Sequence, residues 1–203
     1  MSRNHKVDPA GTQRLDVSMH PRELGEAART DRRFVVGNEM KFAREQWVGV
    51  RWLCAQGVAE HSAEGRVLPG DDPPDLLVDG RGVEVVMALE SGRRPGDEYN
   101  LKVELAKHGQ TLVRRTSLAI VRDHGHNWIV QKIMNKATRY GRAQTSTAWT
   151  LLVYANFSWA DCVHYELVER TLAASPPPFA AVEVLYSVPG AHVARRLFTA
   201  TQP

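Results

Sequence analysis

The spacing of apolar residues along the chain switches between the period of a helix and that of a strand. In the segment NEMKFAREQWVGVRWLCAQG, which begins at Asn38, apolar side chains recur at intervals of three and four residues, as in a helix with one buried face. Asn38 is a candidate N-cap and Gly57 a candidate stop. The predicted inward stripe of this helix is Met40, Ala43, Trp47, Val50 and Cys54.

Two short apolar runs follow, with turn residues between them. Leu76 to Val78 and Val83 to Leu89 have the composition of strands, and the Asp79-Gly80 pair is typical of a tight turn. The two runs therefore predict a β-hairpin.

The second half of the chain alternates helical and strand patterns. Helices are predicted over Asp97 to Thr116, Asn127 to Tyr140 and Ser158 to Ala174, and strands over Ala148 to Ala155, Phe179 to Val188 and His192 to Phe198. This order of elements predicts an α/β sandwich, with a central mixed sheet flanked by helices.

Composition limits the class of protein. A chain of 203 residues with 43% hydrophobic and 24% charged residues fits one globular domain, and we place it at 21–203, after a flexible lead at 1–20 that shows no period. The net charge of +3 leans toward polyanionic partners. The chain has only two cysteines and no long apolar run, so we expect a cytoplasmic protein without a membrane segment.

The candidate chemistry lies in the hairpin. Glu84 interrupts an apolar run, and a buried carboxylate without a partner is costly. The hairpin would bring Asp75 close to it, and two like charges in a buried site need a cation, for which the Val85 carbonyl would supply a third oxygen. The alternative is a turn carboxylate at Asp75 and a Glu84 that is paired with an arginine across the sheet.

Pro74-Asp75, the short hairpin and Glu84-Val85-Val86 resemble the PD-(D/E)XK nuclease superfamily, whose active site reads Pro-Asp, a spacer and Glu-x-Lys. The order of elements is also similar, from about Asn38 to Tyr154. The resemblance implies a restriction-endonuclease-like fold in one PD-(D/E)XK-like domain.

Carried over by position, the resemblance makes Asp75 and Glu84 ligands of Mg²⁺ or Mn²⁺, with Glu39 as an auxiliary acid. Val86 stands where the family has its lysine. Some members place the basic residue on the following helix, and Lys132 or Lys136 would fill that role here, with Lys136 preferred. The competing interpretation of this lysine stripe is a solvated helix face.

The implied activity is metal-assisted phosphodiester hydrolysis, on DNA rather than RNA. The alternative is a catalytically inactive copy of the same fold that binds nucleic acid or a partner protein. A homodimer is a further expectation. The candidates for contacts with the nucleic-acid backbone, chosen by charge and neighbourhood, are Arg93, Arg94, Arg114, Arg115 and Arg139.

One further motif, Asp123-His124-Gly125-His126, has the histidines of a metal site but no companion ligand at useful spacing. We interpret it as a loop with incidental histidines before a helix that begins at Asn127.

Overall fold

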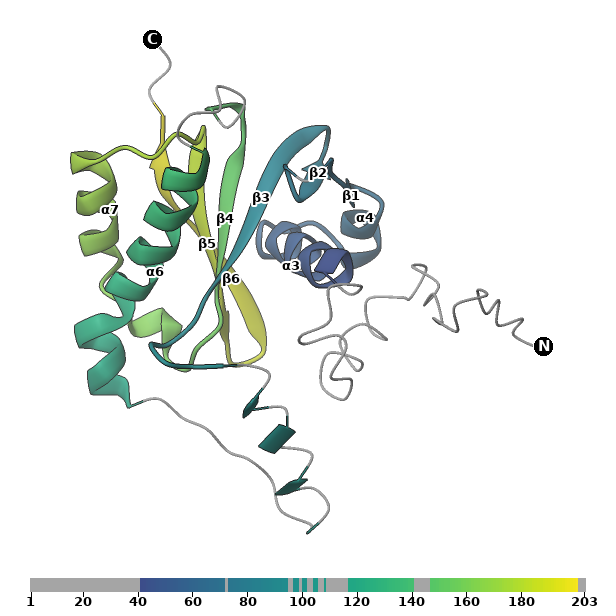
Figure 1. Ribbon diagram of the computed structural model, residues 1–203. Coiled ribbons are helices and arrows are strands. Elements are labelled where there is room, and N and C mark those ends of the chain that lie inside the picture. The colour runs from purple at the N-terminus through teal and green to yellow at the C-terminus, as the bar shows by residue number, and fades with distance from the viewer. Residues whose placement is uncertain are drawn as a thin grey trace, which may run out of the picture.

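Within the described part of the chain, one mixed sheet of six strands forms the centre, with helices on both of its faces (Figure 1). The computed structural model describes residues 41–71, 73–94, 97–98, 100–101, 104–105, 108, 117–140 and 147–200. The strands are β1 (Val67–Pro69), β2 (Leu76–Val78), β3 (Arg81–Ala88), β4 (Thr150–Ala155), β5 (Ala181–Val188) and β6 (Ala191–Thr199). The helices described are α3 (Lys41–Ala55), α4 (Glu60–Glu64), α6 (Leu118–Tyr140) and α7 (Tyr165–Ala174), with a 3₁₀ turn, η3 (Ala160–Cys162).

The sheet keeps the order of the sequence. β1, β2 and β3 form an antiparallel meander, β3, β4 and β5 run parallel, and β6 returns antiparallel to β5. Helices α6 and α7 provide the two crossovers between the parallel strands. The prediction of an α/β fold with a central mixed sheet flanked by helices is confirmed.

The predicted hairpin is β2 and β3, with Leu76 opposite Val83. Its turn residues, Asp79 and Gly80, both have positive φ, at 50° and 74°. Positive φ at both central residues is what a type I′ turn requires, and this turn matches the twist of the flanking strands. The Asp-Gly pair thus sets the register that places the residues of β3.

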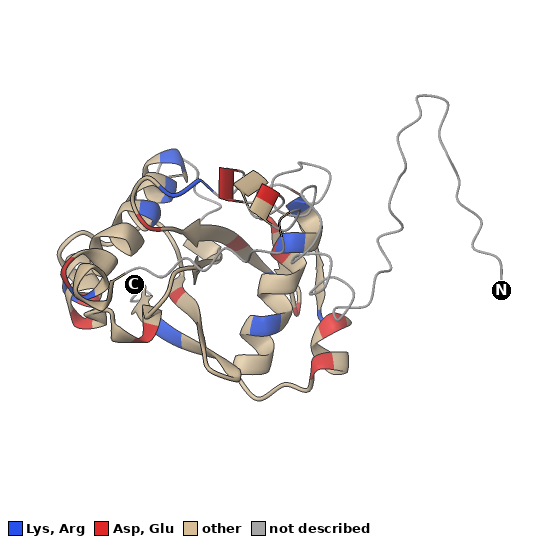
Figure 2. Cartoon of the chain, turned by 90° about the horizontal axis from the view of Figure 1, so that it is seen from below, with Lys and Arg blue, Asp and Glu red and all other residues tan. Residues whose placement is uncertain are grey.

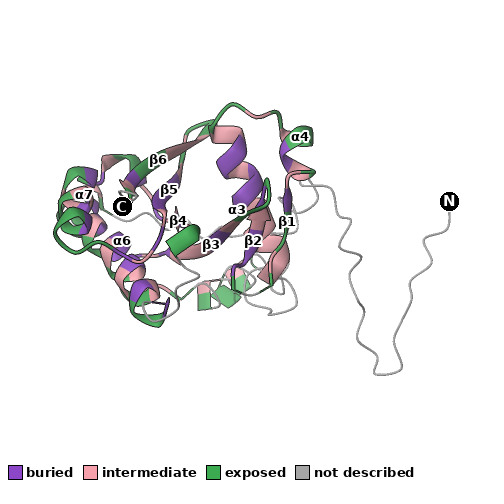
Figure 3. Ribbon diagram, turned by 90° about the horizontal axis from the view of Figure 1, so that it is seen from above, coloured by how far each residue is buried: buried purple, intermediate pink, exposed green. Residues whose placement is uncertain are grey.

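Alternation along β3 divides its side chains between two apolar clusters. Buried residues accordingly lie in the sheet and in helices on both of its sides (Figure 3). Val83 and Val85 pack in the cluster that includes α3, whereas Val86 and Ala88 pack in the cluster that includes α6 and α7. Successive side chains of a strand point to opposite faces. Glu84 therefore faces α6, inside the larger cluster.

The prediction of a loop at Asp123 to His126 is wrong, because α6 begins at Leu118 and includes these residues. A glycine in a helix interior costs about 1 kcal/mol relative to alanine, which made Gly125 look like a break. In the structure Gly125 allows close packing, since a Cβ there would lie 2.8 Å from Val163 Cγ2. The helix predicted over Asn127 to Tyr140 forms the second half of α6, and its apolar residues at helical spacing, Ile129, Ile133, Ala137 and Tyr140, are buried.

The helix predicted from Ser158 is also different. Trp159 has a left-handed backbone, with φ 61° and ψ 27°, which is incompatible with a continuous helix, and the chain forms η3 before α7 begins at Tyr165. The Tyr165 hydroxyl donates a hydrogen bond to the carbonyl of Ala160, at 2.8 Å, and so ties the start of α7 to η3.

The inward stripe predicted for α3 is only partly right. Val50 is buried, but Ala43, Trp47 and Cys54 are half-buried, and the stripe misses the buried residues Val48, Trp52 and Leu53. Trp52 reaches the sheet, where its Nε1–H donates to Glu183 Oε2 at 2.7 Å. α3 packs against β1, β2 and β6, so more than one of its sides is covered.

Several predictions fall on residues outside the described ranges: the lead at 1–20, the start of the domain at 21, and Asn38, Glu39 and Met40. The helix predicted over Asp97 to Thr116 is described only at isolated positions, which have helical backbone at 97–98, 100–101 and 104–105. None of the helices described is long and apolar enough to cross a membrane.

Gly82 on β3 provides a test of the packing beside Glu84. A Cβ at Gly82 would lie 2.4 Å from Trp149 Cδ1, and the Trp149 ring in turn packs edge-on against Tyr140. We expect Gly82→Ala to lower the free energy of unfolding by about 1–3 kcal/mol in denaturant titrations, because an aromatic ring would have to move. Gly65→Ala is the control, since the nearest atom to a Cβ there is 4.0 Å away. Equal stability of the two variants would contradict the packing.

Candidate functional site

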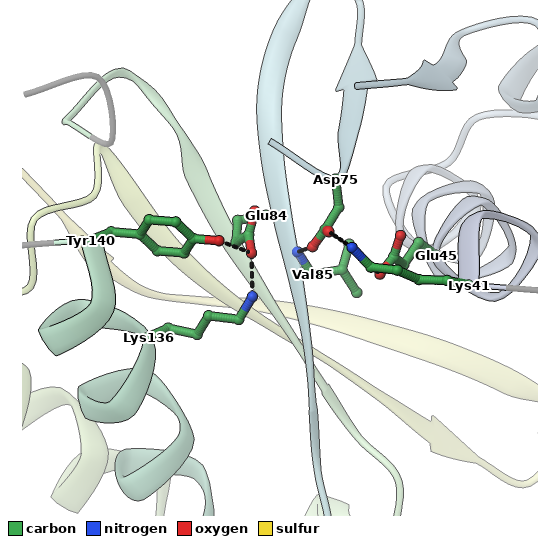
Figure 4. Close-up of polar contacts among 7 residues, drawn as sticks. All are labelled: Lys41, Glu45, Asp75, Glu84, Val85, Lys136 and Tyr140. Atoms are coloured by element: carbon green, nitrogen blue, oxygen red, sulfur yellow. Dashed lines mark hydrogen bonds and ion pairs between the residues drawn. The ribbon is translucent and has the colours of Figure 1, made fainter. Parts of the chain in front are cut away.

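Glu84 is buried completely and only one of its carboxylate oxygens is satisfied (Figure 4). Oε1 accepts a hydrogen bond from the Tyr140 hydroxyl at 2.9 Å and forms an ion pair with Lys136 Nζ. Oε2 is buried and has no hydrogen-bond partner within the described residues. An unsatisfied oxygen on a buried charged group is costly, so this oxygen marks a place for a further ligand.

Both partners of Glu84 come from the last two turns of α6. Lys136 and Tyr140 are four residues apart, so they lie on the same face of the helix. The Lys136 ammonium also lies 5.4 Å from the centre of the Tyr140 ring. Lys132, one turn earlier, makes no hydrogen bond or ion pair with Glu84 in the part of the chain described here. The structure thus brings together Glu84 and Lys136, the lysine preferred from the sequence.

Asp75 lies just before β2 and is buried, with 2% of its side chain exposed. Its Oδ2 accepts a hydrogen bond from the backbone N–H of Val85 at 2.9 Å. Its Oδ1 forms an ion pair with Lys41 Nζ on α3, at 2.9 Å. Asp75, one residue before β2 begins, therefore connects the edge of β3 to the start of α3.

The backbones of Asp75 and Glu84 lie next to each other across the hairpin. The pairing of Leu76 with Val83 places Asp75 beside Glu84 in the extended register. Figure 4 shows the Glu84 side chain directed toward α6, and Asp75 bonded to the next β3 residue, Val85. The charge of Asp75 contributes to the raised pKa of Tyr140, so both carboxylates act on one electrostatic environment.

The carbonyl of Val85 faces the same edge as Asp75. In an extended strand the N–H and C=O of one residue point to the same side, and the Val85 N–H points to Asp75. β2 pairs with β3 only over Arg81 to Val83, so no β2 residue opposite Val85 accepts or donates a ladder bond. Val85 can thus supply the backbone oxygen that the sequence predicted.

Val86, which replaces the expected lysine, packs against the apolar cluster beneath α6. The Val86 side chain is apolar, so the positive charge next to Glu84 comes from Lys136. The described residues contain no group of three or more His, Cys, Asp or Glu side chains that could hold a metal ion. A metal ion at this edge would therefore need oxygen ligands besides the side chains of Asp75 and Glu84.

The arginines proposed for nucleic-acid contacts lie in different settings. Arg93 is half-buried and bound to Glu98, with Nε to Oε1 at 2.8 Å. Arg94 is exposed, and Arg139 is an exposed residue at the end of α6 whose guanidinium lies 5.6 Å from the centre of the Tyr140 ring. Arg114, Arg115 and Glu39 lie outside the described residues.

Sequence reasoning did not assign Lys41 and Tyr140 to the site. For Tyr140 there was a signal, because its spacing of four from Lys136 places both residues on one helix face. Lys41 carried no such signal, because its partner Asp75 is brought to it by tertiary packing alone.

The comparisons with known proteins give one match. No family model and no curated protein matches the chain. Among solved structures, the chain is similar to PA4535 from Pseudomonas aeruginosa strain PAO1, described as a protein of unknown function of the monooxygenase superfamily. The identity is 21%, the TM-score is 0.49, and the match covers 88% of this chain and 83% of the other. At this level of likeness, no activity is carried over.

The comparisons do not support the identification with the PD-(D/E)XK nuclease superfamily. No family model and no curated protein of this superfamily matches the chain, and the solved structure found is not described as a nuclease. The prediction of a restriction-endonuclease-like nuclease, or of its inactive copy, is therefore not upheld. The motif was short and one of its defining residues, the lysine replaced by Val86, was missing, which is why the pattern was not specific.

The ion pair of Glu84 gives a stability test. Lys136→Met should lower the free energy of unfolding by about 3–5 kcal/mol, because it leaves a buried carboxylate without its cation. Lys132→Met, on the same helix, is the matched control and should change little. Adding Glu84→Gln to Lys136→Met should restore most of the loss in denaturant titrations. If Lys136→Met behaves like its control, the ion pair does not hold in solution.

Tyr140 gives a test by pH. Burial, and then the hydrogen bond to Glu84, raise the pKa of Tyr140 from 10.0 to about 12. Because the folded protein holds this proton more tightly than the unfolded chain, the stabilising contribution is complete below pH 10 and is lost as the pH rises to about 12. An ultraviolet titration of the protein minus that of Tyr140→Phe should show one phenol with this pKa. A difference titration centred at the ordinary pKa of 10.0 would contradict the burial of Tyr140 and its hydrogen bond to Glu84.

Proposed function

We propose that the protein binds a divalent cation, Mg²⁺ or Mn²⁺, at the β3 edge and through it the phosphate groups of nucleic acid. The observation that carries this proposal is the Glu84 Oε2 atom, which is buried and has no hydrogen-bond partner in the part of the chain described. A cation at this oxygen would remove the cost of a half-satisfied carboxylate.

The donors fit a hard cation. Glu84 Oε2, a carboxylate oxygen of Asp75 and the Val85 carbonyl are all oxygen ligands, which Mg²⁺ and Mn²⁺ prefer. Three protein ligands leave positions for water, and Mg²⁺ commonly keeps several waters. The Lys136 and Tyr140 contacts use Oε1, so the cation would bind Glu84 without displacing them.

The surroundings support an anionic ligand at the remaining positions. The second half of α6 carries Lys132, Lys136 and Arg139 with no acidic residue among them (Figure 2). Such cations bind phosphates through charge and carry no base specificity. Nucleic acid supplies several phosphates in a row, which suits a basic helix beside a single metal ion.

We test the cation first. Titration calorimetry with MnCl₂ and MgCl₂ should show one site, and a concentration about 100 times the dissociation constant should stabilise the fold by about 2.7 kcal/mol. Glu84→Gln and Asp75→Asn should each weaken binding at least about tenfold, which corresponds to about 1.4 kcal/mol.

Glu183→Gln is the matched control. Glu183 is also a buried carboxylate, but Trp52 and Arg196 already bind both of its oxygens. If Glu183→Gln weakens binding as much as Glu84→Gln, or if no cation binds, the proposed site is refuted. The second part of the proposal, binding of nucleic acid, is tested with a labelled oligonucleotide. Its affinity is measured with Mg²⁺ and with a chelator at several salt concentrations. If the cation binds but does not change the affinity for the oligonucleotide, the proposal that nucleic acid is the ligand is refuted.

A further inference from the structure

Lys41 holds Asp75 at the place where a cation would need it. The Lys41 ammonium lies 2.9 Å from Asp75 Oδ1, and the other oxygen, Oδ2, accepts the Val85 N–H at 2.9 Å. Both oxygens of Asp75 are therefore engaged, whereas Glu84 Oε2 has no hydrogen-bond partner within the described ranges. A carboxylate oxygen has lone pairs for a second contact, but a metal ion and an ammonium group at the same carboxylate repel each other.

The charges of the site are balanced before a metal ion enters. Glu84 is paired with Lys136 and Asp75 with Lys41, which gives two negative and two positive groups. A divalent cation would add two positive charges close to both ammonium groups, and like charges interact strongly where water is partly excluded. Moving one lysine away is the change within the protein that lowers this repulsion.

Burial distinguishes the two lysines. The side chain of Lys136 is 19% exposed, and its ammonium is held between Glu84 Oε1 and the ring of Tyr140. The side chain of Lys41 is 41% exposed, and Glu45, one helical turn further along α3, lies 3.8 Å from its ammonium (Figure 4). Lys41 therefore keeps an acidic neighbour when it leaves Asp75, whereas Lys136 would leave Glu84 Oε1 without its cation.

We propose that Lys41 sets the cation affinity of this site: it neutralises Asp75 in the cation-free protein and is displaced toward Glu45 when Mg²⁺ or Mn²⁺ binds. This inference rests on the cation site proposed above. It adds that the cation competes with a residue of the protein and that its binding is coupled to the first turn of α3, which begins at Lys41.

The test compares Lys41→Met with Lys41→Arg by titration calorimetry with MnCl₂. Lys41→Met removes the competing charge and should tighten Mn²⁺ binding at least about tenfold, which corresponds to about 1.4 kcal/mol. Lys41→Arg should weaken binding, because a guanidinium keeps the charge and can bind a carboxylate through two N–H groups.

Arg195→Met is the matched control. It also removes one positive charge, and the side chain of Arg195 is similarly exposed, at 43%, but it is paired with Glu169 on α7 and not with a candidate cation ligand. The Mn²⁺ affinity of this variant should equal that of the unchanged protein.

Reactivity of the lysine amines gives a second measurement on the unchanged protein. Acetylation followed by peptide mass spectrometry should show a faster reaction at Lys41 when Mg²⁺ is added, because its ammonium leaves a buried carboxylate. The reaction at Lys136 should not change. NaCl at the same ionic strength should leave both rates as they are.

Thermal unfolding of each variant separates altered binding from lost folding. A folded Lys41→Met protein with unchanged Mn²⁺ affinity would overturn the inference, as would tighter binding by Lys41→Arg. If Lys41→Met does not fold, Lys41→Arg and the acetylation rates still decide the outcome. If the unchanged protein binds no Mn²⁺, the proposed function fails together with this inference, whereas binding that requires Glu84 but is insensitive to Lys41 removes this inference alone.

Discussion

The structure around the β3 edge depends on one buried charge, the carboxylate of Glu84. It lies inside an apolar cluster, where an isolated charge would cost several kcal/mol, and it is retained because α6 brings Lys136 and Tyr140 to one of its oxygens. The register of β3 and the packing of α6 must both be correct for this contact to form. Glu84 therefore links the hairpin to the helical layer on the opposite side from α3.

Asp75 makes the corresponding link on the other side. Its carboxylate replaces a ladder partner for the Val85 N–H and receives Lys41 from α3. Two acidic residues that are adjacent on the sheet are thus compensated by lysines from different helical layers. Replacing either pair by apolar residues of similar volume would often be neutral for stability, so the cost of keeping both carboxylates favours a role beyond folding.

The sequence predicted the local parts of this arrangement. The Asp79-Gly80 turn, the two hairpin strands and the apolar stripe of α6 depend on short-range patterns, and the structure has them. The contacts that satisfy Glu84 and Asp75 join residues far apart in the chain, and no local pattern predicts them. Lys136 was found only through a resemblance, and the comparisons do not support the family behind that resemblance.

Two other errors have a common cause. Gly125 looked like a loop residue because glycine weakens helices, yet it serves close packing against Val163. A helix was predicted to start at Ser158, but the left-handed backbone of Trp159 prevents it. In both places tertiary contacts override local propensity.

The central claim is that Glu84 Oε2 is a metal ligand. The most direct measurement is an anomalous difference map from crystals grown with MnCl₂. The account predicts a peak about 2.0–2.2 Å from Glu84 Oε2, with Asp75 and the Val85 carbonyl or waters completing the coordination. Density with no anomalous signal there, or a water bridging Oε2 to another protein group at saturating Mn²⁺, would contradict it.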